Sequence, residues 1–466
     1  MADKRDVVVV GAGPGGYAAA FMAADMGRKV TIIDPEENPG GVCLYRGCIP
    51  TKALLHAVKT IHEAKIARDW GIELGEPKID LDKLRSWKNE VVQKLTRGTG
   101  QLAKRRKIEH IRGTARFRSP GALVVATNDG EQSVEYDQVI LATGAKPQVL
   151  PMVPADDDRV WTSSEALELP FIPEKILVVG AGYIGLEMSY TYLGLGAQVD
   201  LVEMTGSLLP GADRDLVDVF EKANRKRYRR TMLETMVDSV ETRDDGLAVS
   251  FKGDGAPDEP ETYDAILLAT GRKPNFDHID LDAAGIELND AGFVEVDAQM
   301  RTGVDGILAV GDMVGGPLLA HKGHHEGRVA GQVVAGDETA ALDTSVIPAV
   351  VYTDPEIAWV GLTETEAADQ GRKIEVSRFP WAASGRALTM GRSQGLTKLV
   401  IDPETERVLG VLIAGVNAGE LISEGALALE MAATARDLEL TIHPHPTLSE
   451  TIMGAAERFY GNPTDI

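Results

Sequence analysis

One pattern occurs twice in this chain, and it limits the fold more than any other feature. An apolar run at residues 6–10 leads into GAGPGG at residues 11–16 and then into an alanine-rich stretch. A second apolar run, residues 29–33, ends at Asp34, which lies 23 positions after Gly11. Continuous apolar runs predict buried parallel strands, and the glycines let a pyrophosphate approach the N-terminus of the helix between them. The carboxylate stands where a ribose hydroxyl would be bound, so the unit predicts dinucleotide binding.

The second occurrence has the same spacing. Residues 175–179 form a largely apolar strand, GAGYIG follows at residues 180–185, and a strand at residues 198–202 ends at Glu203, again 23 positions after the first glycine. This internal repeat predicts a second dinucleotide site. A carboxylate about 4 Å from a 2′-phosphate would cost roughly 4 kcal/mol per unit charge at an effective dielectric constant of 20. No basic residue follows before Arg214 to offset that cost, so NAD is favoured over NADP.

Further segments define the domains. Residues 139–144 and 266–271 are each an apolar strand that ends in Ala-Thr-Gly, late in its unit. From about residue 345 the pattern changes to strands at 349–352, 396–401 and 408–414 with a helix near 418–433, which is typical of an α+β domain. The predicted fold is therefore α/β, with two Rossmann-like dinucleotide-binding domains and an α+β C-terminal domain. The predicted boundaries are 1–147 and 148–275 for the two dinucleotide-binding domains, 276–344 for a central domain completing the first site, and 345–466 for the C-terminal domain.

Charge and composition exclude two classes of function. The chain has 71 acidic and 48 basic side chains and a net charge of −23, which argues against nucleic acid as a partner. No run reaches the roughly 18 apolar residues that span a bilayer, so no membrane association is expected. The N-terminus enters the first strand without a leader, and the chain has two cysteines, so a cytoplasmic location is expected.

The two cysteines, Cys43 and Cys48, lie close together in the sequence. A disulfide that closes so short a loop adds little stability, which leaves a disulfide that opens and closes in turnover, or two buried thiols. Glycines at 40–41 precede the pair, and IPTK at 49–52 leads into an apolar-periodic run at 53–61. A cysteine at a helix start has a lowered pKa, so these surroundings favour the redox interpretation. A flavin joins thiol chemistry to hydride chemistry, so the first unit should hold FAD.

Several other residues carry weaker signals. Asp312 follows a strand at residues 306–310, where it could bind a ligand or cap the next element. His445 could move protons with Glu450 to orient it, although a histidine between prolines is more often a turn residue. The adjacent His324 and His325 lack the spacing of metal ligands, and no metal is expected.

Two further expectations concern structure alone. Residues 53–110 are predicted to be largely helical, with Trp70 and Trp87 as anchors in the core. The basic run at residues 225–230 is predicted to be a solvated helix end, with docking to an acidic partner as the alternative.

Motifs along the whole chain resemble those of the flavin-dependent disulfide oxidoreductases, and within them the bacterial branch that oxidises dihydrolipoamide. These are GAGPGG at 11–16, GGVCLYRGCIPTK at 40–52, GAGYIGLE at 180–187, ATGRKPN at 269–275, AVGDMVGGPLLAHK at 309–322, VVYTDPEIAWVGLTE at 350–364, FPWAASGRAL at 379–388 and HPHPTLSE at 443–450. The chain departs from the usual pattern at Tyr45-Arg46, where Asn-Val is commoner, at Asp34, where Glu is usual, and at Pro444, where Ala is common. Tyr45 and Arg46 lie between the cysteines, where they could alter the redox poise of the disulfide.

The resemblance implies roles for individual residues. Cys43 would exchange with substrate, Cys48 would lie against the flavin, and His445 of the partner subunit, oriented by Glu450, would be the base. Lys52 would lie near the flavin, paired with Glu187. The expected FAD contacts are Gly11, Gly13, Gly16, Asp34, Lys52, Ala115, Thr143, Gly144, Asp312 and Ala320. The expected NAD contacts are Gly180, Gly182, Tyr183, Ile184, Gly185, Glu187, Glu203, Val237, Gly271 and Arg272.

The resemblance also implies an activity and partners. A homodimer, formed through the C-terminal domain, would oxidise dihydrolipoamide and pass hydride through FAD to NAD. The dihydrolipoamide would be carried by a lipoyl acyltransferase subunit or a lipoyl carrier protein of a 2-oxoacid dehydrogenase or glycine cleavage complex. A mercuric ion reductase would carry another cysteine pair near its C-terminus, and a glutathione reductase would need basic residues where Glu203 stands. Another flavin-dependent disulfide reductase, or a structural or sensing flavoprotein with weak activity, remains the alternative.

Overall fold

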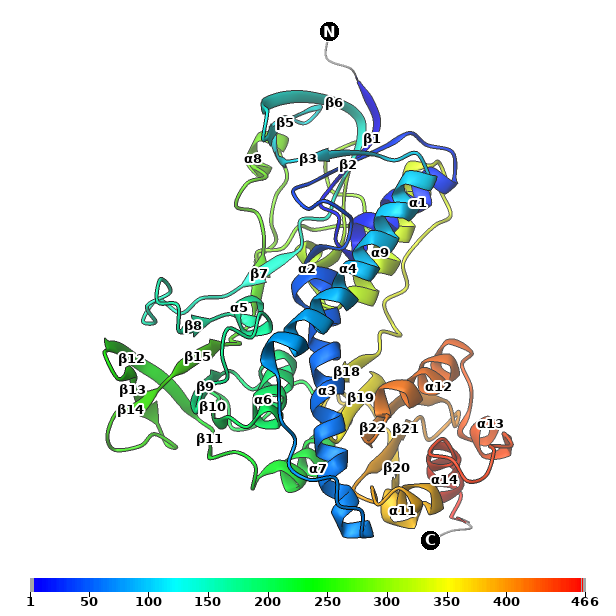
Figure 1. Cartoon of the computed structure of the whole chain (residues 1–466). Helices are drawn as coiled ribbons and strands as arrows, with labels where there is room; N and C mark the ends of the chain where they lie inside the picture. Colours follow the sequence, from blue (N-terminus) through cyan, green and yellow to red (C-terminus); the bar gives the residue numbers. More distant parts are fainter. Residues whose placement is uncertain (1–3, 462, 464–466) are drawn as a thin grey trace.

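The first part of the molecule is a mixed sheet that carries the N-terminal glycine turn (Figure 1). The computed structural model describes residues 4–461 and residue 463. The strand order is β3-β2-β1-β6-β5-β4, with β17 paired to β6. Strand β1 runs parallel to β2 and to the second half of β6, whereas the first half of β6 pairs antiparallel with β5. The strands are β1 (Arg5–Val10), β2 (Val30–Asp34), β3 (Glu109–Arg112), β4 (Thr114–Ser119), β5 (Ala122–Thr127), β6 (Gly130–Leu141) and β17 (Ile307–Ala309).

The second part repeats the first. Its sheet has the order β11-β10-β9-β15-β8 with every pair parallel, which matches β3-β2-β1-β6-β17 strand for strand. An antiparallel sheet, β12-β13-β14, takes the place of β4 and β5. The strands are β8 (Val160–Trp161), β9 (Lys175–Val179), β10 (Gln198–Val202), β11 (Arg230–Met232), β12 (Thr235–Arg243), β13 (Gly246–Gly253), β14 (Glu261–Tyr263) and β15 (Ala265–Leu268). The internal repeat and the α/β fold predicted from the sequence are confirmed.

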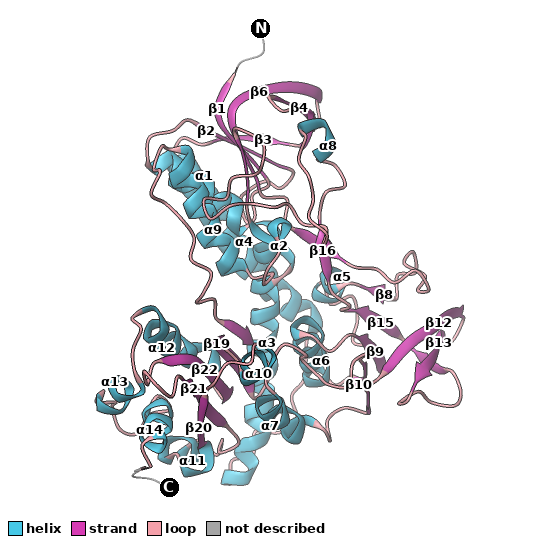
Figure 2. Cartoon of the chain, turned by 180° about the vertical axis from the view of Figure 1, so that it is seen from behind, coloured by secondary structure: helices cyan, strands magenta, loops and turns pink. Residues whose placement is uncertain are grey.

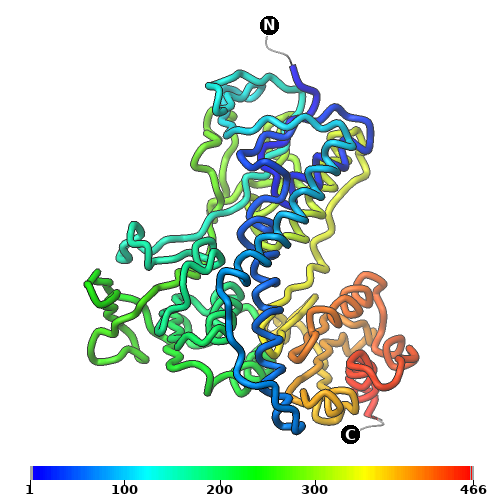
Figure 3. The backbone as a smooth tube through the Cα atoms, viewed as in Figure 1, coloured from blue at the N-terminus to red at the C-terminus, as the bar shows by residue number. Residues whose placement is uncertain are grey.

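The chain leaves the first part and later returns to it (Figure 3). Two short strands, β7 (Ala145–Pro147) and β16 (Arg272–Pro274), pair antiparallel where the two units join. After β16 the chain runs back to the first sheet, adds β17 and forms helix α9 (Ala320–Val334) beside helix α1 (Pro14–Asp25). Residues from both ends of the region 5–334 therefore build the first site.

Glycines allow α1 and α9 to lie in contact. A Cβ atom at Gly327 would lie 2.1 Å from the carbonyl oxygen of Gly15, and one at Gly331 would lie 2.7 Å from that of Ala19. Larger residues would force the helices apart. The close contact fixes the N-terminus of α1 against the segment that follows β17.

Long helices α3 (Cys48–Ile66) and α4 (Leu81–Arg105) cross the centre of the molecule, as the helical prediction for 53–110 required (Figure 1). The prediction that Trp70 and Trp87 anchor the core is wrong, because they are 56% and 39% exposed. Helix α4 buries one face only, through residues that include Lys88, Val92 and Thr96. Trp87 precedes Lys88, so the helical period turns it away from that face.

The C-terminal part is an antiparallel sheet with helices packed around it (Figure 2). The order is β18-β19-β22-β21-β20, and the predicted strands at 349–352, 396–401 and 408–414 are confirmed. The strands are β18 (Ala349–Val351), β19 (Glu356–Gly361), β20 (Glu375–Pro380), β21 (Leu396–Ile401) and β22 (Val408–Gly415). The remaining helices of the chain are α2 (Gly41–Arg46), α5 (Ser163–Leu167), α6 (Tyr183–Leu195), α7 (Arg214–Asn224), α8 (Leu281–Ala284), α10 (Glu364–Asp369), α11 (Gly385–Thr389), α12 (Ala418–Glu430), α13 (Ala435–Leu440) and α14 (Glu450–Phe459).

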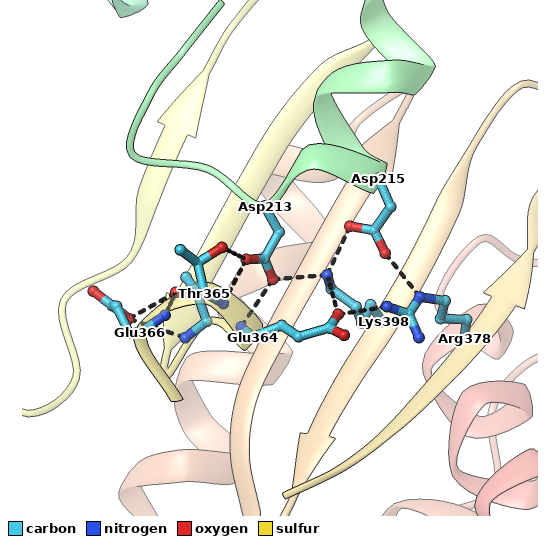
Figure 4. Close-up of polar contacts among 8 residues, drawn as sticks. Asp213, Asp215, Glu364, Thr365, Glu366, Arg378 and Lys398 are labelled. Atoms are coloured by element: carbon cyan, nitrogen blue, oxygen red, sulfur yellow. Dashed lines mark hydrogen bonds and ion pairs between the residues drawn. The ribbon is translucent and has the colours of Figure 1, made fainter. Parts of the chain in front are cut away.

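A buried ion cluster joins the second part to the C-terminal part (Figure 4). The ammonium of Lys398, on β21, is fully buried and lies 2.7 Å from a carboxylate oxygen of Asp213 and 2.7 Å from one of Asp215. Glu364, at the start of α10, is 3.3 Å from the same ammonium, and Arg378 on β20 binds both Asp215 and Glu364. The N-terminal end of α7 is therefore held on the C-terminal sheet by paired charges.

The basic run at 225–230 follows α7, and the prediction of a solvated helix end holds only for Arg225 and Lys226. Tyr228 is buried, Arg229 donates to Asp200 at 2.8 Å, and Arg230 lies 2.7 Å from Glu261. Acidic partners within the chain therefore occupy Arg229 and Arg230, whereas Arg225 and Lys226 are exposed to solvent.

Among the described residues, no helix combines the length and the apolar character that crossing a membrane requires.

Candidate functional site

A cavity of about 380 Å³ lies where the first glycine turn, the cysteine loop and the edge of the second unit meet. Its walls come from the turn after β1, helices α2 and α3, the segments after β6 and β17, and the start of α6. The carboxyl ends of parallel strands of the first unit therefore face this space, as in other open α/β sheets that bind ligands, and the start of α6 from the second unit closes it.

The glycine turns have nearly the same geometry in both units. Gly11 has φ +94° and Gly180 has φ +100°, and a Cβ atom at these positions would lie 2.3 Å and 2.5 Å from the carbonyl oxygens of Ala142 and Ala269. Each turn thus packs on the Ala-Thr-Gly segment of its own unit. A Cβ atom at Gly16 would lie 1.9 Å from the Gly11 oxygen, so this glycine lets the helix start close to its strand.

The acid at the end of each second strand also occupies the same position. Asp34 accepts hydrogen bonds from the backbone N–H of Ala12 at 2.7 Å and of Glu36 at 2.9 Å. Glu203 accepts from the N–H of Ala181 at 2.8 Å and of Thr205 at 2.9 Å. Burial raises the pKa of Asp34 despite these bonds. Each carboxylate is held beside its glycine turn, where a ribose would lie.

The two cysteines occupy consecutive helices. Cys43 lies in α2, a helix not predicted from the sequence, and Cys48 is the first residue of α3; both are free thiols that line the cavity. A hydrogen bond from the Cys43 thiol, with help from the Lys52 ammonium, lowers the pKa of Cys48 to about 7. The same hydrogen bond, together with burial, raises the pKa of Cys43. The negative charge of the reduced pair therefore lies on Cys48, and the lowered pKa expected for the pair applies to that residue alone.

Lys52 lies one turn beyond Cys48 and makes an ion pair with the second unit. Its ammonium is 2.8 Å and 3.0 Å from the carboxylate oxygens of Glu187, as the resemblance implied. Burial opposes the charge of Lys52, but Glu187 outweighs it and the pKa of Lys52 is raised. The pair keeps a cation beside the Cys48 thiolate.

Tyr45 and Arg46, the unusual residues between the cysteines, support the preceding loop. The Tyr45 hydroxyl donates to the carbonyl oxygen of Asn38 at 3.0 Å, and Arg46 binds the carboxylate of Glu36. Both side chains therefore contact the loop at residues 36–38.

The structure brings most of the predicted FAD contacts together at the cavity. Its lining includes the predicted residues Gly11, Gly13, Asp34, Cys43, Cys48, Lys52, Ala115, Thr143, Gly144, Asp312 and Ala320. From the predicted NAD set it includes Tyr183, Ile184, Glu187 and Arg272. Outside the lining lie Gly16, Gly180, Gly182, Gly185, Glu203, Val237 and Gly271. Of these, Val237 has its side chain in the core beneath the second sheet, so it could contact a cofactor only through its backbone.

His445 and Glu450 lie apart from the cavity. The imidazole Nδ1 is 2.8 Å from a carboxylate oxygen of Glu450, as predicted, and the His445 side chain is 80% exposed. Neither residue lines the cavity that contains the cysteines. The His445 imidazole therefore faces solvent rather than the cavity of its own chain, which is compatible with a role in the site of a second subunit.

Several residues of the lining were not predicted from the sequence. Arg46, Thr51 and Glu36 flank predicted residues, whereas Asn275, His278 and Ile279 come from the loop after β16. The ATGRKPN segment ends at Asn275, so its position beside the cavity could have been expected; nothing in the sequence marks His278. Among residues 4–461, no three His, Cys, Asp or Glu side chains are grouped as a metal ion would require.

Two family models match the chain. The first, described as pyridine nucleotide-disulphide oxidoreductase, covers residues 5–327, and the second, the dimerisation domain of the same proteins, covers residues 347–456. The first match ends within α9, and the second begins just before the C-terminal sheet.

Curated relatives align over nearly the whole length. The dihydrolipoyl dehydrogenase of Vibrio cholerae is 49% identical over 463 residues, which are 99% of this chain and 97% of that protein. The dihydrolipoyl dehydrogenase of Thermus scotoductus is 45% identical over 457 residues, or 98% and 97% of the two chains.

Solved structures share the fold at lower identity. LpdA from Mycobacterium tuberculosis has a TM-score of 0.89 at 27% identity, covering 98% of this chain and 99% of that one. The HOCl-induced flavoprotein disulfide reductase RclA from Escherichia coli, in a Cu(II) complex, has a TM-score of 0.88 at 27% identity with the same coverage.

Proposed function

Because the chain belongs to the pyridine nucleotide-disulphide oxidoreductases, and within them to the dihydrolipoyl dehydrogenases, we propose that its cysteine pair oxidises dihydrolipoamide for transfer of hydride to NAD. Proteins of this family use FAD and NAD. The observation that carries the proposal is the position of Cys43 and Cys48 in a cavity shared by two dinucleotide-binding units, with a cation next to Cys48.

The residues at the cavity fit FAD. The absence of side chains at Gly11 and Gly13 leaves the N-terminus of α1 open to a pyrophosphate, and a Cβ atom at Gly41 would lie 2.4 Å from the Gly13 Cα and close that approach. Asp34 would bind the ribose, and Asp312 with Ala320 would hold the ribityl and phosphate part. When bound, FAD supplies the acceptor that links two-electron thiol oxidation to hydride transfer.

The side chains divide the thiol chemistry between them. His445 of the partner subunit, held by Glu450, takes the proton of one substrate thiol. The substrate sulfur attacks Cys43 of the disulfide, and Cys48 leaves as a thiolate, which Lys52 stabilises. The second substrate thiol then displaces Cys43 and closes the lipoyl ring, so the substrate loses two electrons and two protons while the cysteine pair is reduced.

The NAD site lies on the second unit. The open turn at Gly180 and Gly182 would receive the pyrophosphate and Glu203 would bind the ribose, with Gly185, Val237 and Gly271 completing the contacts. Tyr183, Ile184 and Arg272 would lie at the nicotinamide end, since these three line the shared cavity.

The match to the dimerisation domain supports a homodimer. Beyond it, we expect a lipoyl acyltransferase subunit or a lipoyl carrier protein to deliver the substrate, in the cytoplasm. The net charge of −23 would favour a basic docking segment on that partner.

The experiment is anaerobic reduction of the FAD-loaded protein by dihydrolipoamide, followed by addition of NAD. We expect a long-wavelength absorbance from the Cys48 thiolate beside the flavin, which NAD then removes as NADH forms. A Cys48→Ser variant should lose this absorbance, whereas a Cys43→Ser variant should keep it and lose turnover. A wild-type spectrum that dihydrolipoamide leaves unchanged, but that another dithiol alters, would assign a different disulfide substrate.

A further inference from the structure

Three parts of the molecule meet around the ammonium of Lys52. Lys52 comes from α3 of the first unit, Glu187 from α6 of the second, and Tyr352 follows β18 of the C-terminal part. The Tyr352 ring centre is 4.5 Å from the Lys52 Nζ. The backbone N–H of Tyr352 also donates to Glu187 Oε1 at 3.0 Å, the same oxygen that Lys52 contacts. One tyrosine thus contacts both members of the ion pair.

The C-terminal part holds this ring in a fixed place. A Cβ atom at Gly419, near the start of α12, would lie 3.3 Å from Tyr352 Cε1 and 2.9 Å from Val350 Cγ1. The glycine therefore leaves the space that the ring occupies. On the same face of α3, Lys59 Nζ donates to Asn417 Oδ1 at 3.3 Å, which docks the helix on the same loop.

We propose that Tyr352 is a positioning residue for the dithiol chemistry, which holds Lys52 through its ring face and Glu187 through its backbone amide so that the cation stays beside Cys48. This inference rests on the proposed function. It assigns to the C-terminal part a role in the redox centre of its own chain, in addition to the His445 that it would lend to the partner.

The physical basis is electrostatic. An aromatic face attracts a cation, and the attraction strengthens when the cation is partly withdrawn from water, as Lys52 is with its side chain 34% exposed. A displaced ammonium would lower the pKa of Cys48 less, since the Coulomb interaction falls with distance. The titratable groups that face Cys48 are Cys43, Lys52, Glu187, Tyr183 and Tyr17.

The test is a pH titration of the long-wavelength thiolate absorbance in FAD-loaded protein that has received one two-electron equivalent of dithionite, which reduces the cysteine pair and leaves the flavin oxidised, so that no lipoyl substrate is needed. Tyr352→Leu should raise the apparent pKa by about half a unit or more, whereas Tyr352→Phe, which keeps the ring and the amide, should leave it unchanged. Gly419→Ala, which crowds the ring, provides a second variant and should also raise the apparent pKa of the thiolate absorbance.

A double-variant cycle separates positioning from general disturbance. Tyr352→Leu should have no further effect on the apparent pKa when Lys52 is already Met. An equal shift in that background, or an unchanged pKa in both Tyr352→Leu and Gly419→Ala, would overturn the inference. Absence of the absorbance in the wild-type protein would instead refute the proposed function, and the inference with it.

Discussion

At the scale of single residues, the two histidines of the HPHP segment have opposite environments. His445 is 80% exposed and bound to Glu450, whereas the side chain of His443 is 4% exposed and lies between Glu424 and the carbonyl oxygen of Thr441. Both nitrogens of His443 are used within the chain. His445 keeps Nε2 available for a substrate thiol.

We therefore predict that His445→Ala lowers kcat for dihydrolipoamide oxidation by about 10²- to 10⁴-fold, the range expected for a general base. The free energy of unfolding of the His445→Ala variant should differ from that of the wild type by less than about 0.5 kcal/mol, because the side chain is exposed. Steady-state kinetics and denaturant unfolding measure the two effects. The matched control, His443→Ala, should lower stability and leave kcat per folded molecule nearly unchanged; a large kcat effect in the control alone would reverse the assignment.

Residue chemistry was the easiest level to predict. Two cysteines in a glycine-bounded segment and a histidine five residues from a glutamate stand out in any reading of the sequence, and the His445–Glu450 bond is present. The sequence could not predict that Tyr45 and Arg46 bind residues 36–38, because such contacts depend on how a loop folds back. Nor could it place His278, which reaches the cavity only through the pairing of β7 with β16.

At the scale of elements, the contact between α1 and α9 determines where the first glycine turn lies. Gly323, Gly327 and Gly331 recur every four residues along α9, so they share one face. A Cβ atom at Gly323 would lie 3.3 Å from the Gly311 Cα, so the stripe reaches the turn that carries Asp312. Glu326, which is buried beside it, accepts from the Gly311 N–H at 2.7 Å.

We predict that Gly327→Ala destabilises the protein by about 1–3 kcal/mol and weakens FAD binding, because the new methyl group displaces α1. Differential scanning calorimetry and titration of the apoprotein with FAD would measure both. Gly98→Ala, inside α4 with nothing within 4 Å of the added Cβ, is the matched control and should be neutral or stabilising by up to about 1 kcal/mol. Equal losses in the two variants would show that helix contact is not the cause.

The sequence predicted those elements whose pattern lies in adjacent residues, but it did not predict which of their faces are buried. The strand, glycine turn, helix and acid of each unit follow from adjacent residues. The exposure of Trp70 and Trp87 depends on which face of each helix the other parts cover, and an aromatic side chain alone does not reveal this.

At the scale of the whole molecule, the parts are joined by shared apolar surface and by the Lys398 cluster. The sequence shows Lys398 within the apolar strand at 396–401 but does not predict its ion-pair partners, because Asp213 and Asp215 are far away in the sequence. The repeat predicted two similar units, but the arrangement of three parts around Lys52 required the structure.

We predict that Lys398→Met lowers the free energy of unfolding by about 3–5 kcal/mol, since three carboxylates would lose their buried cation. Thermal unfolding should show the loss. Limited proteolysis should cleave the variant faster, because α7 would be held less tightly on the C-terminal sheet. Lys222→Met provides the control, because that side chain is 78% exposed and lies 4.0 Å from the exposed carboxylate of Asp218. Similar losses in both variants would argue against a special role for burial.

The separation of His445 from the cysteine cavity has a consequence for genetics. If each site draws its cysteines from one subunit and its histidine from the other, a null allele in Cys48 and a null allele in His445 can complement each other, although both lie in one gene. Random pairing of the two products in a C2 dimer would restore about a quarter of the sites, all in mixed dimers. Two alleles that both alter Cys48 would restore none. Growth of a strain that carries one allele of each kind would therefore show that Cys48 and His445 of one site come from different subunits.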